Sequence, residues 1–274
     1  MPSGTHDPIA RIRSALRADR RHAAARELLT AVARHGLRDD DELPALLRRG
    51  LGADGARKLL AALADLPCFH CKNGVQRCER CRGAGRDGRA TVCHFCLGLG
   101  ITSCEFCNGA GLTTYDLLPA ALRVPALDFR AKLALRQADR LLKEPVHAAG
   151  SPQPSQGRKQ LGGRLFGLDR VLGILENVVC GVREASRNRR TLRPFAARVL
   201  RACRRAAPKL DRRIRAILKQ MEAAEQAGLA NASSATARKE SEQRVELFRS
   251  LQKRRGFRGT TLQHPFLKLG ATLR

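Results

Sequence analysis

The sequence predicts a mostly α-helical protein with one small, cysteine-rich module of β-hairpins inserted between helical regions. Alanine, leucine and arginine, which favour helices, dominate the chain, and aromatic residues make up only 4% of it. Eight of the ten cysteines lie between Cys68 and Cys107. At 274 residues, the chain is long enough for two modest domains, each with its own apolar core.

These patterns divide the chain into six predicted segments. They are an N-terminal helical domain (1–66), the cysteine-rich module (67–115), a helix (116–147), a linker (148–164), a basic helical region (165–256) and a C-terminal tail (257–274).

The N-terminal domain is predicted from apolar residues at helical spacing, among them Ile12 and Leu28, up to a break at Gly36. Acidic residues from Asp39 to Glu42 favour the start of a further helix, because carboxylates stabilise a helix N-terminus. The stretch from Gly50 to Leu59 resembles the hairpin of the helix-hairpin-helix motif, which binds DNA phosphate. An ordinary helix–turn–helix is the interpretation that we favour there.

Each of four short repeats in the module carries two cysteines separated by two residues. The pairs are Cys68/Cys71, Cys78/Cys81, Cys93/Cys96 and Cys104/Cys107. This spacing lets a tight turn bring both sulfurs onto one metal ion at about 2.3 Å, and two such turns complete a tetrahedron. Eight thiolates therefore predict two four-cysteine zinc sites. Structural disulfides are disfavoured because we expect no secretory signal, and a redox site would need one pair rather than four.

Glycines follow the second cysteine of the repeats, where the chain must turn with a positive φ. The predicted turn glycines are Gly74, Gly83, Gly85, Gly98, Gly100, Gly109 and Gly111. The first repeat departs from the pattern, because Asn73 and Val75 stand where the other repeats have glycine. Asparagine tolerates the left-handed conformation, so we expect the turn to form at Asn73 as well.

Because three of the repeats read C-x-x-C-x-G-x-G, residues 68–111 resemble the cysteine-rich zinc-finger domain of the DnaJ co-chaperone family. The resemblance implies a small V-shaped set of β-hairpins held by two zinc ions. It also implies that the outer repeats share one ion and the inner repeats the other, whereas the spacing alone leaves three pairings open. The implied ligands are Cys68, Cys71, Cys104 and Cys107 for the first ion, and Cys78, Cys81, Cys93 and Cys96 for the second.

The resemblance covers only about 44 residues of the chain. The J domain of that family carries a His-Pro-Asp tripeptide, whereas His6-Asp7-Pro8 has another order and His264-Pro265-Phe266 another third residue. We therefore expect a finger without J-domain activity.

Three phenylalanines, Phe69, Phe95 and Phe106, lie inside the cysteine knuckles. They are candidate contacts for an unfolded or assembling protein client. The alternative, which we favour from the sequence, is that they pack between metal sites that lack any other core.

The later helices are predicted from apolar stripes. The first stripe runs from Leu127 to Leu142 and ends before Pro145, and the linker after it is rich in Pro, Gln, Ser and Gly. The basic region opens with the apolar stretch Leu165 to Val182 and continues with stripes over 210–221 and 245–251.

Positive charge is concentrated in this last part of the chain. The net charge is +27, of which residues 116–274 carry +21, and Arg183 to Lys219 holds 14 basic residues against two acidic ones. Such a face needs a polyanion or an acidic protein to offset its charge. RNA or DNA phosphate is the commonest such partner, and an acidic membrane surface is a weaker alternative. The candidate polyanion contacts are Arg198, Arg201, Arg204, Arg205, Arg212, Arg213 and Arg215.

The sequence favours a non-enzymatic protein. Both predicted zinc sites are filled by cysteine, and we find no paired acids in an apolar setting, P-loop or dinucleotide fingerprint. With no apolar stretch long enough to span a membrane and no signal-like N-terminus, we expect a cytoplasmic location. The function that we favour is a protein-interaction or chaperone-like folding or assembly factor. The alternative is a protein that binds the backbone of RNA or DNA, or a ribosome, through its arginine-rich helices.

Overall fold

The computed structural model describes residues 7–35, 42–85, 93, 100–107, 109–143, 154–187, 189–230 and 235–253. Within these residues helices predominate, and a small cysteine-rich module with one two-stranded sheet lies between helical regions, as the sequence predicts. The elements in chain order are α1 (Pro8–Arg17), α2 (Arg21–His35), α3 (Glu42–Ala64), β1 (Val75–Arg77), β2 (Ile101–Ser103), α4 (Ala120–Lys143), α5 (Pro154–Ser186), the short 3-10 helix η1 (Arg190–Leu192), α6 (Arg193–Leu229) and α7 (Ala235–Lys253).

The N-terminal helices are set by local capping and turn residues. Asp7 caps α1 by accepting a hydrogen bond from the backbone N–H of Ile9 at 2.9 Å, with Pro8 as the first helical residue. Asp19 has a φ of 53°, which separates α1 from α2 within a stretch that the apolar spacing had presented as continuous. Gly52, with a φ of 71°, interrupts α3 and divides it into two helical parts.

The cysteine-rich module is built as nested antiparallel pairings. Strand β1 pairs with β2 in the register Val75 with Ser103 and Arg77 with Ile101, and outside them Pro67 forms a bridge with Leu112. The second and third repeats lie between β1 and β2. The first and fourth repeats therefore flank one end of this short sheet, and the second and third flank the other.

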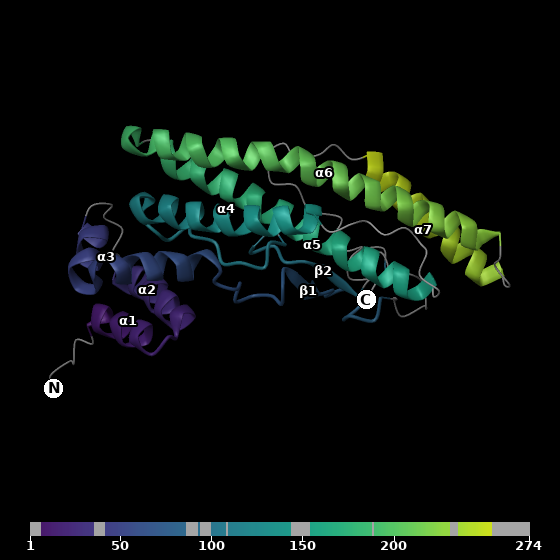
Figure 1. Cartoon of the computed structure of the whole chain (residues 1–274). Coiled ribbons are helices and arrows are strands. Elements are labelled where there is room, and N and C mark those ends of the chain that lie inside the picture. The colour runs from purple at the N-terminus through teal and green to yellow at the C-terminus, as the bar shows by residue number, and fades with distance from the viewer. Residues whose placement is uncertain are drawn as a thin grey trace.

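The later helices form a layered bundle (Figure 1). The long helix α6 runs along the top, α4 and α5 lie beneath it, and α7 packs against α6 near its C-terminal end. The linker expected over residues 148–164 is shorter than predicted, because α5 already begins at Pro154. Residues 154–164, which show no amphipathic pattern, are thus helical because they extend the helix that contains the buried stretch from Leu165 to Val182.

One continuous apolar core joins the N-terminal helices to the bundle. It includes Ile12 and Leu28 from the first helices, Leu63 from α3 and Leu175 from α5, all nearly inaccessible to solvent. The helices on either side of the module therefore do not bury separate cores. In the part of the chain that the structure describes, no helix has the length and apolar character needed to cross a bilayer.

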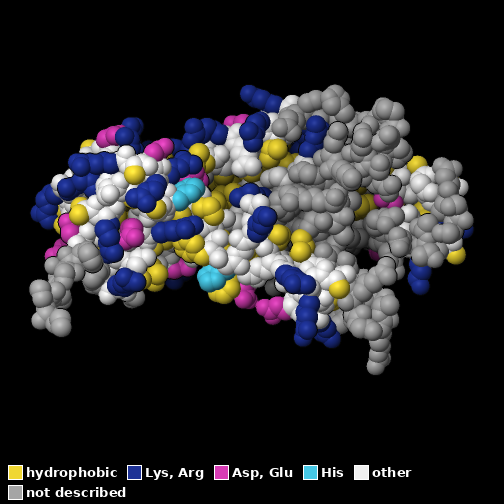
Figure 2. Space-filling view, turned by 90° about the horizontal axis from the view of Figure 1, so that it is seen from below, with side chains coloured by type: hydrophobic (Ala, Val, Ile, Leu, Met, Phe, Trp, Pro, Cys, Tyr) yellow, Lys and Arg dark blue, Asp and Glu magenta, His cyan; other side chains and the backbone are white. Residues whose placement is uncertain are grey.

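The face that carries the N-terminal helices and the module shows basic and acidic side chains side by side (Figure 2). Ion pairs in the N-terminal part of the chain include Arg21 with Asp65 at 2.8 Å and Lys58 with Asp54 at 2.9 Å. The charge on this face is therefore mixed.

Candidate metal centre

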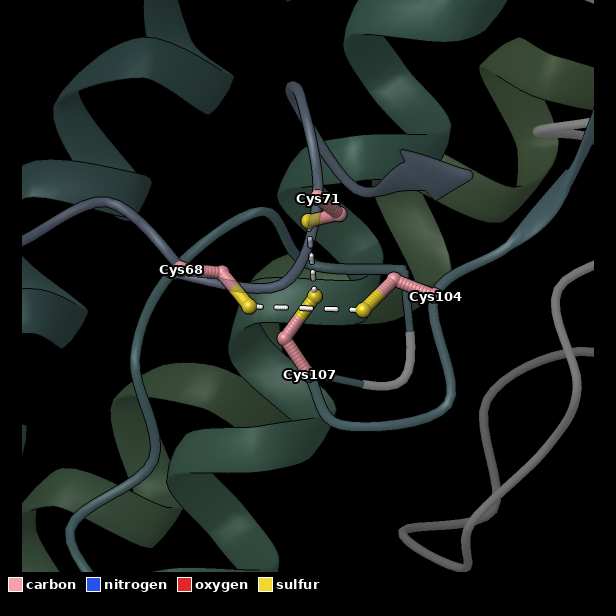
Figure 3. Close-up of side chains that lie close together, drawn as sticks. All are labelled: Cys68, Cys71, Cys104 and Cys107. Carbon is pink, nitrogen blue, oxygen red and sulfur yellow. Dashed lines mark hydrogen bonds between the residues drawn. The ribbon is translucent and has the colours of Figure 1, made fainter. Parts of the chain in front are cut away.

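Four cysteines from the first and fourth repeats point their sulfurs toward a common centre (Figure 3). The sulfur atoms of Cys68, Cys71, Cys104 and Cys107 all lie within 4.8 Å of one another. The Sγ atoms of Cys68 and Cys104 are 4.0 Å apart, and those of Cys71 and Cys107 are 3.7 Å apart.

These distances match the edges of a tetrahedron around a metal ion. With metal–sulfur bonds of about 2.3 Å, the sulfurs of a tetrahedral zinc site lie about 3.8 Å from one another. Three of the four cysteines are buried and Cys71 is half-buried. The cluster therefore has the donor atoms, the spacing and the shielding from solvent that a structural zinc site requires.

A second cluster contains the described cysteines of the two inner repeats. Cys78, Cys81 and Cys93 are buried, and their sulfurs also lie within 4.8 Å of one another. The fourth expected ligand, Cys96, lies outside the described residues, as do Gly98 and Phe95. The three described cysteines form a small buried cluster of their own, with no other apolar residue packed into it among the residues that are described.

Backbone hydrogen bonds pair the repeats independently of the sulfurs. The N–H of Cys68 donates to the carbonyl of Gly111 at 3.0 Å, and the N–H of Cys104 donates to Gly74 at 2.8 Å. The inner repeats repeat this arrangement: the N–H of Cys78 donates to Gly100 at 2.8 Å, and that of Cys93 to Gly85 at 2.9 Å. The outer repeats are thus joined to each other, and so are the inner ones.

The turn glycines place backbone donors at the sulfurs. The N–H of Gly111 donates to the sulfur of Cys107 at 3.2 Å, and the N–H of Gly85 donates to the sulfur of Cys81 at 3.3 Å. The glycines at these turns have φ values between 69° and 90°: Gly74, Gly83, Gly85, Gly100, Gly109 and Gly111. Asn73 takes the left-handed conformation with a φ of 55°, so the turn forms in the first repeat as well, and Val75 opens strand β1.

Burial makes the outer cluster unfavourable for thiolates until a cation is present. Burial raises the pKa of Cys107 to about 12. It also raises the pKa of Cys71, and the nearby sulfur of Cys107 raises that pKa further. A bound divalent ion reverses this preference, since its charge stabilises each thiolate directly. The residues therefore fit a metal that prefers thiolate ligands.

The module is held to the helices by buried and partly buried polar contacts that sequence reasoning missed. Tyr115 donates its hydroxyl hydrogen to the carbonyl of Leu63. Arg130 of α4 donates to Ala64 at 2.9 Å and stacks on the Tyr115 ring at 4.1 Å. Two residues of α5 reach the fourth repeat: Arg170 donates to the carbonyl of Ala110 at 3.3 Å, and Asn177 donates to that of Cys107 at 2.9 Å. They lie far along the chain from the cysteines, and no local motif marks them.

Two of the three knuckle phenylalanines are described, and both are exposed. Phe69 is 52% accessible to solvent and Phe106 is 51% accessible. The ring of Phe106 stacks on His70 with centroids 3.9 Å apart, and Arg26 lies 5.2 Å from the centre of the Phe69 ring. These side chains therefore do not fill the space between metal sites, which was the interpretation that we favoured from the sequence.

The candidate polyanion contacts of α6 fall into two groups. Five of them are exposed: Arg198, Arg201, Arg204, Arg205 and Arg212. Arg213 and Arg215 are half-buried. Arg215 pairs with Asp211 at 3.0 Å and donates to the carbonyl of Gln252 at 3.2 Å, so it joins α6 to α7.

Comparison with known protein families, with curated proteins and with solved structures finds no match to this chain.

Proposed function

We propose that the protein binds the phosphate backbone of nucleic acid, RNA foremost, through an arginine face on α6, carried by a scaffold that two zinc ions hold together. We define the arginine face as Arg198, Arg201, Arg204, Arg205 and Arg212. The observation that carries the proposal is that these five side chains are exposed and, among the described residues, form no ion pair with an acid.

The arginine face lies opposite the buried face of the same helix. At about 100° per residue, the buried positions Val199, Cys203 and Leu210 fall on one side of α6, and Arg201, Arg205 and Arg212 fall on the other. At 1.5 Å per residue, Arg198 and Arg212 are about 21 Å apart along the axis. Several members of the face stand three or four residues apart, as Arg201 and Arg205 do, and like charges at this spacing repel one another. A row of phosphates relieves this repulsion and releases its own counterions on binding.

The contacts of the cysteine module favour a scaffolding role for it. Arg170 and Asn177 of the bundle bind its backbone, and Tyr115 ties it to Leu63 at the end of α3. Arg130 of α4 stacks on the Tyr115 ring. Because the module is fixed to the core on several sides, its role is to hold the surrounding helices in place. Zinc is the ion that we propose, because four thiolates in a closed tetrahedral site favour it and leave no position for a substrate. The proposed role is therefore binding, without catalysis.

The test is a binding titration with a labelled mixed-sequence RNA and the full-length, zinc-loaded chain. We compare wild type with the triple variant Arg201→Gln, Arg205→Gln, Arg212→Gln. The matched control, Arg34→Gln, Arg48→Gln, Arg49→Gln, removes the same charge from exposed positions on the N-terminal helices. We expect tight binding by wild type that weakens steeply with salt. The α6 variant should lower the slope of log K against log salt by about 0.7 for each lost contact with a single strand.

The control triple variant should keep the wild-type slope. Equal losses in the two triple variants would mean that net charge alone drives binding, and the α6 proposal would be wrong. Absence of wild-type binding at about 50 mM salt, where phosphate contacts are strong, would also overturn it.

A second candidate function is a protein-interaction or chaperone-like role of the finger, and the exposure of Phe69 and Phe106 favours it. The two rings come from the repeats that share the outer cluster, so a metal would fix both. The variant Phe69→Ser, Phe106→Ser should then lose the ability to suppress aggregation of a denatured client while keeping its zinc. If wild type suppresses no aggregation, this second candidate is excluded.

A further inference from the structure

A half-buried arginine of α5 lies beside the outer cysteine cluster without an acidic partner among the described residues. Arg170 donates a hydrogen bond to the carbonyl of Ala110, three residues after Cys107. The groups that favour its charge are the sulfurs of Cys107 and Cys71, whereas its burial lowers the pKa of the guanidinium. No ion pair with a carboxylate is found for it within the described part of the chain.

The second arginine near the cluster differs in this respect. Arg130 is more deeply buried, but Asp65 as well as Cys107 favours its charge, and the Tyr115 ring covers its guanidinium. Among the described groups, the cysteine sulfurs alone favour the charge of Arg170, whereas Tyr115 and Asp65 favour that of Arg130 in addition to Cys107.

The charge of the cluster depends on the metal. Four neutral thiols carry no net charge, whereas four thiolates around one Zn²⁺ carry about −2. A buried guanidinium next to neutral thiols is an unpaired buried charge, which is costly. The same guanidinium next to the metal-bound cluster is paired, and it also stabilises the excess negative charge of the thiolates.

We infer that Arg170 is the charge partner of the metal-bound Cys68, Cys71, Cys104 and Cys107 cluster, so that metal binding at this cluster and the docking of α5 on the module stabilise each other. The inference rests on the proposed zinc sites and is independent of RNA binding. It makes Arg170 a positioning residue of the metal site, contributed by a helix more than 60 residues beyond the last ligand.

The experiment measures zinc affinity by competition with a chromogenic chelator for the full-length chain and three variants. Arg170→Gln removes the charge, Arg170→Lys keeps it, and Arg140→Gln removes an exposed charge from α4 as the control. We expect Arg170→Gln to weaken one of the two zinc equivalents by about tenfold, which is at the lower end for loss of a group that supports metal ligands. Arg170→Lys should recover most of this loss, and Arg140→Gln should match wild type.

A second measurement separates the charge role from a merely structural one. Asn177→Ala removes the neutral hydrogen bond to Cys107 from the same helix. It should lower the melting temperature of the zinc-loaded and the metal-free protein alike. Arg170→Gln should lower the melting temperature only in the zinc-loaded form, because in the metal-free form it removes an unpaired buried charge.

Three outcomes would overturn the inference. They are unchanged zinc affinity in Arg170→Gln, an equal loss in Arg170→Lys, and an equal drop in melting temperature with and without zinc. If the wild-type chain binds no zinc, the proposed metal sites fail together with the inference. If wild type binds two ions and Arg170→Gln does the same with equal affinity, only the inference fails.

Discussion

Gly74 and Gly109 approach each other so closely that a Cβ atom at Gly74 would lie 2.0 Å from the carbonyl oxygen of Gly109. The backbones of the first and fourth repeats cross at this point, beside the outer cysteine cluster. The hydrogen bond from Cys104 to Gly74 lies next to this crossing. The pairing of these two repeats thus depends on a residue with no side chain.

Gly74→Ala should therefore destabilise the zinc-loaded protein strongly. The new methyl group meets backbone, which cannot move aside, and the φ of 90° is strained for alanine. We expect a loss of about 2–4 kcal/mol in the free energy of unfolding, measured by denaturant titration with circular dichroism. Gly228→Ala is the control, because it lies in a helix with open space around it. It should gain about 0.5–1 kcal/mol. If Gly74→Ala leaves the free energy of unfolding unchanged, the close approach of the Gly74 and Gly109 backbones is refuted.

Cys107→Ser should remove one metal ion from a protein that we expect to bind two. The hydroxyl of serine is a poor zinc ligand, and the buried site has no other donor to replace the thiolate among the described residues. Metal content per chain, measured by atomic emission after dialysis, should fall from about two to about one. Cys180→Ser, a cysteine in α5 outside both clusters, should leave the content unchanged. Equal metal content in Cys107→Ser and wild type would contradict the site.

The single tyrosine should resist ionisation until the solution is strongly alkaline. Burial raises the pKa of Tyr115 to about 12, although Arg130 opposes the shift. An unfolded chain ionises its tyrosine near pH 10, so alkali favours unfolding between these two values: stability is lost as the pH rises above about 10. Ultraviolet absorbance of the phenolate reports this residue alone. A midpoint near 10 in the folded protein would show that Tyr115 is open to solvent.

The docking of α7 on α6 should weaken in acid. Glu222 of α6 accepts hydrogen bonds from Arg249 at 2.8 Å and Gln252 at 2.7 Å, and both partners hold its pKa below the ordinary value of 4.5. A lowered pKa stabilises the fold above 4.5, and this contribution is lost as the pH falls through the folded value.

Glu222→Gln should accordingly reduce the hydrogen-exchange protection of α7 at neutral pH. Its difference from wild type should disappear in acid, where the wild-type carboxylate is protonated. Glu242→Gln removes an exposed pair within α7 itself, with Arg238 at 3.4 Å, and should have little effect. An equal loss of hydrogen-exchange protection in both variants would mean that the contact of Glu222 with α7 does not stabilise the docking of α7 on α6.

The cysteine spacing carried most of the information about the module. Two residues between paired cysteines and glycine after the second one are local requirements of a metal knuckle, so the sequence displays them directly. To predict that the two outer repeats share one ion, we needed the family resemblance, because four equivalent repeats can combine in pairs in three ways. The hydrogen bonds of Cys68 and Cys78 to Gly111 and Gly100 now support that pairing from geometry.

Contacts between distant segments were beyond sequence reasoning. Arg170 and Arg130 look like any other arginine in a chain with many, and only the fold places them beside the module. Arg215 is a candidate polyanion contact by its sequence, but it pairs with Asp211 one turn earlier on α6 and donates to the carbonyl of Gln252 on α7. Helical periodicity locates an apolar stripe well, whereas it does not say which polar residues a neighbouring helix will cover.

The nested pairing of the repeats also sets the order in which the module can close. Between Cys81 and Cys93 lie 11 residues, whereas 32 lie between Cys71 and Cys104. Closing the longer loop first would cost about 1 kcal/mol more in chain entropy. Once the inner cluster has formed, however, the outer knuckles are brought near each other. The chain should therefore assemble from the tip of the module toward the helices, with the outer cluster and its contacts to α5 completed last.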